Sequence, residues 1–396
     1  MMRRILFVDD EPRILEGLRR MLHGERDHWD LRFAGSGAAA LAELAREPAD
    51  VVVTDMRMPG MDGAELLARV ATVAPDAIRI VLSGQTDDLA STRTVPVAHQ
   101  FLTKPCQAQV LREVVERACA LRELLASPGL RRLIGTVDTL PSVPAIWHEL
   151  GRVLSDPASS VGQLAEIIEQ DAGLSARVLH LVNSAFFGQR RQVTSVAQAT
   201  SLLGTGLIRS LALAQHVFST GFTATAVGCT VEAEQAHGLA VARLARALPG
   251  DAALAETAFS AGLLHDVGKL ILATRLPQAF ADDLRQSRAL QVPLHDIELR
   301  RAGVTHAEVG AYLLGLWGLP HPVLEAVAHH HRPGRVIPGD RRVVLAVHVA
   351  DALIHERDEG AGRAAARLDL EVLAHAGWSR RLDEWRARAE ELEADG

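Results

Sequence analysis

Four short apolar runs divide the first 125 residues of this 396-residue chain into a regular pattern. Between them lie stretches with helical periodicity, such as residues 38–46 and 64–73. Unbroken apolar runs are typical of strands that are buried on both faces, and strands that alternate with helices form a parallel, doubly wound sheet. We therefore expect an α/β domain with a parallel, doubly wound sheet. The runs are residues 5–8, 51–53, 78–82 and 101–102.

The expected sheet gathers charged and hydroxyl side chains at one edge, because doubly wound sheets carry their functional residues beyond the carboxyl ends of the strands. Three carboxylates at this edge repel one another unless a hard cation such as Mg²⁺ lies among them. With that cation and a lysine ammonium to neutralise the transferred charge, an aspartate can attack a phosphoryl group. The side chains at this edge are Asp9, Asp10, Asp55, Ser83 and Lys104.

The motifs around these residues, VDDE, TDMRMPGMDG, LSG and FLTKP, resemble those of the receiver domain of two-component response regulators. The resemblance implies a (βα)5 doubly wound fold. It also implies that Asp55 accepts phosphate from a histidine kinase and that Lys104 contacts the phosphoryl group. It also implies that Ser83 and Phe101 form a conformational switch. The segment before Lys104 departs from the pattern, because it offers only a short helical candidate at residues 87–93. The implied Mg²⁺ ligands are Asp9, Asp10, Asp55 and the backbone carbonyl of Arg57.

A helical pattern over residues 107–125 closes the first domain, with Val110, Val114, Ala118 and Leu121 on one apolar face. Ser127, Pro128 and Gly129 then break the pattern, and a short linker comes next. A short joint lets phosphorylation of the receiver act mechanically on the second domain. The predicted divisions are a receiver domain at 1–126, a linker at 127–135, a second domain at 136–356 and a charged helical tail at 357–396.

The second domain has helical periodicity throughout, and capping boxes at Ser160/Gln163 and Ser195/Gln198 mark helix starts. We expect it to be all-α. Its segments LPSVPAIW, IIEQDAGLSARVLHLVNSAFFG and TSVAQATSLLGTGLIRSLAL resemble the opening of the HDOD domain, an output domain of bacterial signalling proteins. The resemblance implies a signalling or protein-interaction module. Phosphorylation would change its packing or its assembly into a homodimer, and a downstream signalling protein would bind the altered surface.

The same domain contains side chains of the types that bind transition metals. Neutral imidazoles and carboxylates suit Fe, Mn or Zn, and an aspartate can bridge two metal ions that activate water. His265 and Asp266 are adjacent, so on one helix they would diverge by about 100° and could converge only near a helix end. A capping box at Thr305 and Glu308 would place His306 in a first helical turn. The candidate ligands are His237, His265, Asp266, His306, His330, His331 and Asp351.

These residues resemble the H…HD…D pattern of HD hydrolases. They also resemble the extra histidines of the HD-GYP phosphodiesterases, which act on cyclic di-GMP. The resemblance implies an alternative function, in which the second domain is a metal-dependent phosphodiesterase regulated by the receiver. Two departures weigh against this enzyme. No Gly-Tyr-Pro comes after His331, and Ala233 replaces a glutamate four residues before His237, with Glu234 as a weak substitute. His348 and His355 share a helix face with Asp351 by spacing but have no motif support.

Lysine usage distinguishes two positions. Lys104 and Lys269 are the only lysines among 42 basic residues, so the remaining ones are arginines. An arginine cannot replace a compact ammonium where one is needed. Lys269 lies four residues after His265, so we expect it on the same helix face, where it could bind phosphate as a point charge.

Charge and cysteine content exclude other classes of function. Both halves of the chain carry net negative charge, within a total of −7, so neither nucleic acid nor an anionic membrane is favoured as a partner. A helix-turn-helix interpretation is set aside because its second helix, residues 196–203, carries no Arg, Lys or Asn to reach a base edge. The chain has no long apolar run, no signal-peptide pattern at its start and three cysteines without paired spacing, so we expect a cytoplasmic protein.

Overall fold

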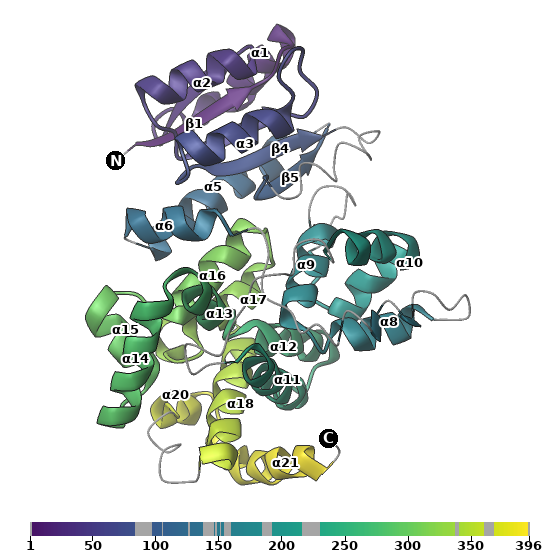
Figure 1. Cartoon of the computed structure of the whole chain (residues 1–396), viewed down its shortest axis with the longest axis vertical. Helices are drawn as coiled ribbons and strands as arrows, with labels where there is room; N and C mark the ends of the chain where they lie inside the picture. Colours follow the sequence, from purple (N-terminus) through teal and green to yellow (C-terminus); the bar gives the residue numbers. More distant parts are fainter. Residues whose placement is uncertain are drawn as a thin grey trace. The chain divides into compact units, whose positions relative to one another are not determined.

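The computed structural model divides the chain into two compact units, each of which is described by itself (Figure 1). The first is made chiefly of Met1–Asp138, and the second of Thr139–His180, Gln192–Leu314 and Leu319–Gly396. The described residues are 2–83, 97–104, 106–125, 127–137, 146, 149–150, 152–153, 160–183, 192–215, 230–336, 340–359 and 368–394.

The first unit contains a five-stranded parallel sheet in the order β2-β1-β3-β4-β5. Each connection returns through a helix where the chain is described, as expected for parallel strands. This confirms the predicted α/β fold. The strands are β1 (Arg3–Val8), β2 (Trp29–Ala34), β3 (Val51–Asp55), β4 (Ile78–Ser83) and β5 (Gln100–Thr103), and the helices are α1 (Pro12–Met21), α2 (Gly37–Arg46), α3 (Gly63–Val73) and α5 (Ala108–Leu124).

One face of this sheet packs on α2 and α3 (Figure 1). Leu6, Val8 and Val52 point to that face, and the alternate residues point to the other, where α5 contacts β3. Both sets are buried, which explains the unbroken apolar runs. The edge strand β2 has no such run, because its four central residues are only half-buried. The apolar face predicted for α5 is correct except at Val110, which is 40% exposed.

The predicted linker is not an extended tether. Residues 128–135 form helix α6 (Pro128–Gly135), whose first turn is capped by the Ser127 hydroxyl oxygen accepting from Leu130 N–H. Its last residue is anchored to the sheet, because the buried Arg79 of β4 donates to the Gly135 carbonyl at 2.8 Å. The Ser-Pro-Gly sequence therefore ends α5 and begins the next helix. The helical candidate at residues 87–93 lies outside the described residues.

All regular secondary structure that the structure describes in the second unit is helical, as predicted. Helix α11 packs on α12 and α18, and α17 packs on α12 and α18. The predicted C-terminal tail packs on this domain, because α21 contacts α11 and α18 and buries Trp385. The helices are α8 (Val161–Ile168), α9 (Ala172–Asn183), α10 (Val196–Gln215), α11 (Val231–Ala247), α12 (Ala252–Leu264), α13 (Val267–Arg275), α14 (Pro277–Leu290), α15 (Leu294–Ala302), α16 (His306–Leu316), α17 (His321–His329), α18 (Arg342–Glu359), α20 (Leu370–His375) and α21 (Leu382–Ala394).

The helix starts agree with the predicted caps. The Ser160/Gln163 capping box is complete, and the Ser195 hydroxyl oxygen accepts from Gln198 N–H. In the part of the chain that the structure describes, no helix combines the length and the apolar character needed to cross a bilayer.

Candidate metal centres

The carboxyl edge of the sheet brings three aspartates together. Asp9, Asp10 and Asp55 each offer a carboxylate oxygen, and these oxygens lie within 4.8 Å of one another. Lys104 reaches the same point from the end of β5, with its Nζ 2.8 Å from Asp9 Oδ2 and 2.6 Å from Asp55 Oδ1. Such a grouping of carboxylates suits a hard divalent cation, and the ammonium offsets part of the remaining negative charge.

The electrostatics of this edge result from its burial. Desolvation raises the pKa of Asp55, although the Lys104 ammonium opposes the shift. Desolvation lowers the pKa of Lys104, but Asp55 and Asp9 outweigh it and raise that pKa. The lysine is therefore held in its charged form beside the carboxylate.

The other residues predicted at this edge lie around the aspartates or outside the described side chains. Arg57 and Asp10 line a surface pocket of about 490 Å³ next to the aspartates. Gly63 allows the chain to pass close to Asp55, because a Cβ there would lie 2.3 Å from the Asp55 carbonyl oxygen. Ser83 ends β4 and Phe101 lies in β5, but both side chains fall outside the described part of the structure.

In the second unit, five separate segments bring all seven predicted ligands to one place. His237 comes from α11 and Asp351 from α18. His306 is the first residue of α16, where the Thr305/Glu308 cap was predicted to put it. His330 and His331 lie directly after α17. The ligand atoms fall into two groups, each within 4.8 Å, and Asp266 belongs to both.

The helical conformation is interrupted at His265 and Asp266, between α12 and α13. Helix α12 ends at Leu264 and α13 begins at Val267, so His265 and Asp266 lie at the junction. Adjacent side chains can converge there, as expected near a helix end. Just before this junction α12 packs closely on α11, because a Cβ on Gly262 would lie 2.9 Å from Ala242 Cα of α11.

We call the first group site A. His265 Nε2 lies 3.1 Å from Asp266 Oδ2 and 3.5 Å from Asp351 Oδ1. His237 Nε2 lies 3.1 Å from the same Asp351 oxygen and 3.8 Å from Asp266 Oδ2. Site A therefore joins two imidazoles and two carboxylates.

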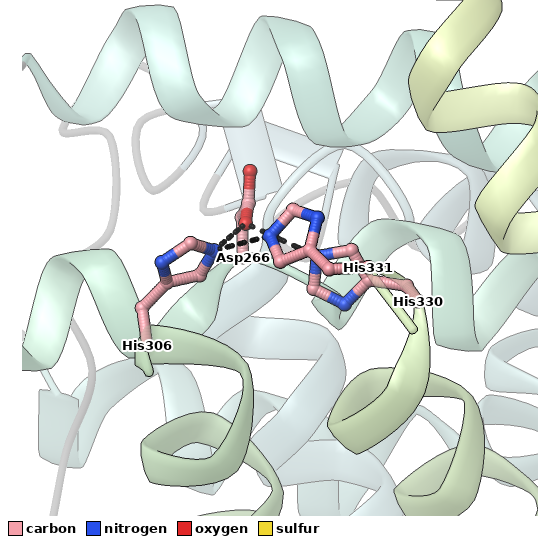
Figure 2. A group of neighbouring side chains, drawn as sticks. All are labelled: Asp266, His306, His330 and His331. Carbon is pink, nitrogen blue, oxygen red and sulfur yellow. Dashed lines mark hydrogen bonds and ion pairs between the residues drawn. The ribbon is translucent and has the colours of Figure 1, made fainter. Parts of the chain in front are cut away.

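We call the second group site B, and Figure 2 shows its three imidazoles pointing toward Asp266. At site B the other carboxylate oxygen is used: Asp266 Oδ1 lies 3.1 Å from His306 Nε2 and 3.8 Å from His330 Nε2. His331 Nε2 lies 2.9 Å from His306 Nε2. Because Oδ2 faces site A and Oδ1 faces site B, Asp266 has the arrangement of a bridging ligand.

The far nitrogens of three imidazoles show which tautomer the site holds. Nδ1 of His265 lies 2.6 Å from the Gly262 carbonyl, and Nδ1 of His330 lies 2.8 Å from the Val327 carbonyl. His306 Nδ1 lies 2.7 Å from Glu298 Oε2. Carbonyl and ionised carboxylate oxygens only accept, so each Nδ1 carries a proton, and it is Nε2 that each ring would offer to a metal ion in place of a proton. This is the outer-shell pattern of metal-bound histidines.

The atoms that face the centre of the cluster are better suited to binding a metal ion than to hydrogen-bonding with one another. His265 Nε2, His330 Nε2 and Asp266 Oδ1 are buried and have no hydrogen-bond partner among the residues that the structure describes. Buried polar atoms are rarely left in that state. Imidazole nitrogens and carboxylate oxygens in this mixture suit Fe, Mn or Zn. The residues present therefore fit a pair of metal ions.

Charge in this cluster favours cations. Desolvation lowers the pKa of His265, but the carboxylates of Asp266 and Asp351 outweigh it and raise that pKa to about 10. Against the same desolvation, Glu298 and Asp266 raise the pKa of His306 to about 9. Desolvation lowers the pKa values of His237, His330 and His331, so the carboxylates hold protons on only two of the five imidazoles. At those two, the same carboxylates also favour a divalent ion in place of the protons.

Lys269 contacts the cluster, but not for the predicted reason. It belongs to α13 and not to the helix that precedes His265, so the two share no helix face. Its Nζ lies 2.5 Å from Asp266 Oδ2 and 3.6 Å from Glu234 Oε2. Glu234, the weak substitute for a glutamate ligand, is thus an ion-pair partner of Lys269.

Other residues lie around the ligands. Glu298 and His295 were not predicted from the sequence, whereas His348 and His355 were considered only for their spacing to Asp351. Glu298 precedes His306 by eight positions on a different helix, α15, so no spacing rule connects them. His295 stacks on His331, with ring centroids 4.0 Å apart. His355 Nε2 lies 3.4 Å from Asp351 Oδ1, in line with its helical spacing. His348 faces elsewhere, since its Nδ1 lies 2.6 Å from the His330 carbonyl and its Nε2 accepts from Asp369 N–H.

Comparison with known families divides the chain as the structure does. Residues 5–116 match the response regulator receiver domain, and residues 140–333 match the HDOD domain. Together these matches cover both the aspartate edge and the histidine cluster up to His331.

Individual relatives match parts of the chain. An uncharacterized protein of Treponema pallidum is 27% identical over 201 residues, covering 49% of this chain and 38% of its own length. The response regulator protein PilR of Pseudomonas aeruginosa is 34% identical over 156 residues, covering 39% of this chain and 34% of its own. The chain thus spans less than half the length of these curated relatives.

A solved structure supports the fold. The crystal structure of a virulence factor from Campylobacter jejuni superposes with a TM-score of 0.54 and 21% identity. The match covers 66% of this chain and 96% of that one. At this identity the likeness concerns the fold alone.

Proposed function

Because this chain is a response regulator with a receiver domain at residues 5–116 and an HDOD domain at 140–333, we propose that phosphorylation of the receiver controls a dinuclear metal centre in the HDOD domain. The second domain would hydrolyse a phosphoester. The observation that carries the proposal is the position of Asp266, whose two oxygens face two separate groups of imidazoles.

The receiver reaction uses the aspartate edge of the sheet. We propose that an Asp55 carboxylate oxygen attacks the phosphorus of a phosphodonor, such as the phosphohistidine of a kinase, and that the donor's bond to phosphorus breaks. Asp9, Asp10, Asp55 and the Arg57 carbonyl would hold Mg²⁺, which neutralises phosphoryl charge when bound. Lys104 Nζ, already 2.6 Å from Asp55 Oδ1, is placed to contact the phosphoryl oxygens. Ser83 and Phe101 would couple this event to the rest of the domain.

Phosphorylation can be tested on the full chain with acetyl phosphate and Mg²⁺. Intact mass should rise by one phosphoryl group in the wild type and not in Asp55→Ala. The matched control is Asp27→Ala, an exposed aspartate away from the edge, which should be labelled normally. Labelling that persists in Asp55→Ala would refute the assignment of the acceptor.

In the HDOD domain each residue has a distinct role. Site A would be held by His237, His265, Asp266 and Asp351, and site B by Asp266, His306, His330 and His331. When bound, the two ions activate water and neutralise phosphate charge. Lys269 keeps a buried ammonium beside the bridging carboxylate, where it can bind a phosphate oxygen. Glu298 and the Gly262 and Val327 carbonyls keep three ligand rings oriented.

A signalling module without turnover is the second candidate, and the burial of the site favours it. Side chains of His265 and His330 are 0% exposed, and Asp266 only 6%. A metal pair with so little access could serve as a structural core, while the surface of the domain binds a downstream signalling protein.

An assay of phosphodiester hydrolysis distinguishes the hydrolase from the signalling module. Full-length protein loaded with Mn²⁺ or Fe²⁺ should hydrolyse cyclic di-GMP or the chromogenic diester bis(p-nitrophenyl) phosphate, and Asp266→Asn should abolish hydrolysis. Acetyl phosphate should change the rate in the wild type but not in Asp55→Ala. A protein that contains two metal ions and hydrolyses neither substrate, with or without acetyl phosphate, would favour the signalling module.

A further inference from the structure

Helix α18 presents more than one candidate ligand to site A. Asp351 and His355 lie one turn apart on the same face, and His355 Nε2 is 3.4 Å from Asp351 Oδ1. His348, on the other side of Asp351, has both ring nitrogens engaged by the His330 carbonyl and Asp369 N–H. Of the two histidines that flank Asp351, His355 is therefore the one directed at the metal centre. Its ring lies 4.5 Å from that of His237.

Three imidazoles converge on a single oxygen. Asp351 Oδ1 lies 3.1 Å from His237 Nε2, 3.5 Å from His265 Nε2 and 3.4 Å from His355 Nε2. Two ligands that bind one ion at about 2.1 Å and neighbouring angles are themselves roughly 3.0–3.4 Å apart. The spacing around this oxygen is therefore that of ligands on a common metal ion. At least one of the three, His265, directs Nε2 to this point as the nitrogen that a metal ion would bind, because its Nδ1 proton faces the Gly262 carbonyl.

We infer that His355 is a fifth protein ligand of site A, an inference that rests on the metal centre proposed above. Site A then offers three imidazoles and two carboxylates, whereas site B offers three imidazoles and the shared Asp266. On an octahedral ion, the five protein ligands of site A leave one coordination position open, and the four of site B leave two. Site A accordingly selects a five- or six-coordinate ion such as Fe²⁺ or Mn²⁺ over tetrahedral Zn²⁺. With fewer protein ligands, an ion at site B would have more positions left for a phosphate oxygen of the substrate.

The test uses Co²⁺ as a probe, because its visible absorption weakens as coordination number rises. Metal-free full-length protein is titrated with Co²⁺, and bound metal and absorption are both measured. The parent protein, called the wild type in this test, and all variants carry Asp10→Asn, so that the receiver site contributes no bound ion. The wild type should bind two ions. His355→Ala should bind one of them at least about tenfold more weakly, and its absorption per bound ion should increase. His355→Glu, which restores a ligand of similar reach, should recover wild-type affinity.

The control is His375→Ala, because His375 is exposed and its ring contacts only a carbonyl of its own helix among the contacts that the structure assigns to it. This variant should titrate like the wild type. If the wild type binds two Co²⁺ ions and His355→Ala matches it in affinity and absorption, His355 is not a ligand and this inference is wrong. If the wild type itself binds fewer than two ions, the proposed dinuclear centre is wrong, and the inference falls with it. Circular dichroism of His355→Glu shows whether a loss reflects unfolding.

Discussion

Glu298 determines which nitrogen of His306 faces the metal centre. Its Oε2 accepts from the His306 backbone N–H at 2.9 Å and from Nδ1 at 2.7 Å, and the side chain is 1% exposed. One carboxylate thus fixes both the start of α16 and the orientation of a ligand ring. Such outer-shell carboxylates raise the basicity of the imidazole that they contact.

We expect Glu298→Ala to weaken metal binding at site B by about 10–100-fold while site A is retained. The change also leaves two buried donors of His306 without an acceptor, which costs about 1–3 kcal/mol for each. Glu298→Gln keeps an accepting oxygen and should have the smaller effect. Calorimetric titration of metal into the wild type, Glu298→Ala and Glu298→Gln measures the order of their affinities. Glu232→Gln, at an exposed position, is the control. Equal affinities in all of them would show that Glu298 does not support the site.

At the residue scale, the sequence predicts ligands better than their supports. All seven predicted ligands come together, because each had a recognisable chemical type and a recognisable neighbourhood. Glu298 and the Gly262 carbonyl could not be predicted, since they act through tertiary contacts that leave no spacing in the chain. Composition singled out Lys269, and it does contact Asp266, but the helix-face argument for its position was wrong because α12 ends before His265.

Among the helices, α13 and α16 approach so closely that only glycine fits between them. A Cβ on Gly268 would lie 1.8 Å from the His306 carbonyl oxygen and 2.9 Å from Gly310 N. This contact holds His306 of one helix against Asp266 at the start of the other. The spacing of site B is therefore set by backbone packing as well as by side chains.

Gly268→Ala should force these two helices apart. We expect a loss of at least about 1–3 kcal/mol in the free energy of unfolding, as for other overpacked sites, together with weaker metal binding at site B. Gly162→Ala in α8 is the matched control, because its Cβ would meet its nearest neighbour at 3.7 Å. That change should be neutral or stabilising by up to about 1 kcal/mol. Thermal melts of both variants provide the comparison, and equal stability would contradict the packing argument.

Helix α6 depends on Arg79 of β4. The guanidinium is buried and donates to the Gly135 carbonyl at 2.8 Å and to the Val97 carbonyl at 2.7 Å. Arg79→Met should leave both carbonyls without this donor, cost about 1–3 kcal/mol and speed hydrogen exchange in residues 131–135. Arg69→Met, which removes an exposed ion pair with Glu65, should change neither. Unchanged exchange in Arg79→Met would show that α6 is held by other contacts.

At the element scale, the sequence predicts most of the receiver sheet but not its edge. Strands with apolar residues on both faces were recognised from their runs, whereas β2, with half-buried central residues, was not. The joint was predicted as a linker because Ser127, Pro128 and Gly129 break one helix. The same residues are a serine cap and a first-turn proline of the next. Local signals of this kind mark a boundary but do not specify the element on its far side.

At the scale of the whole molecule, each of the two compact units contains a group of carboxylates suited to binding divalent cations. The receiver group contains three aspartates and a lysine, so it suits a hard ion held by oxygen atoms. The HDOD group is rich in imidazole and suits transition metals. The two centres therefore differ in chemistry, although one ion, Mn²⁺, is acceptable to both.

This difference predicts that metal binding stabilises the units separately. Two compact units in one chain can unfold in two transitions, and an ion at 100 times its Kd stabilises the unit that binds it by about 2.7 kcal/mol. Calorimetric scans of the full chain with Mn²⁺ or with a chelator should show both transitions rise with metal. Asp266→Asn should abolish only one of the two shifts, and Asp10→Asn only the other. If either variant removed both shifts, the two centres would not be independent, because loss of one would then dismantle the other. If Asp266→Asn removed neither, the buried imidazole cluster would be held together by its ion pairs alone, without metal.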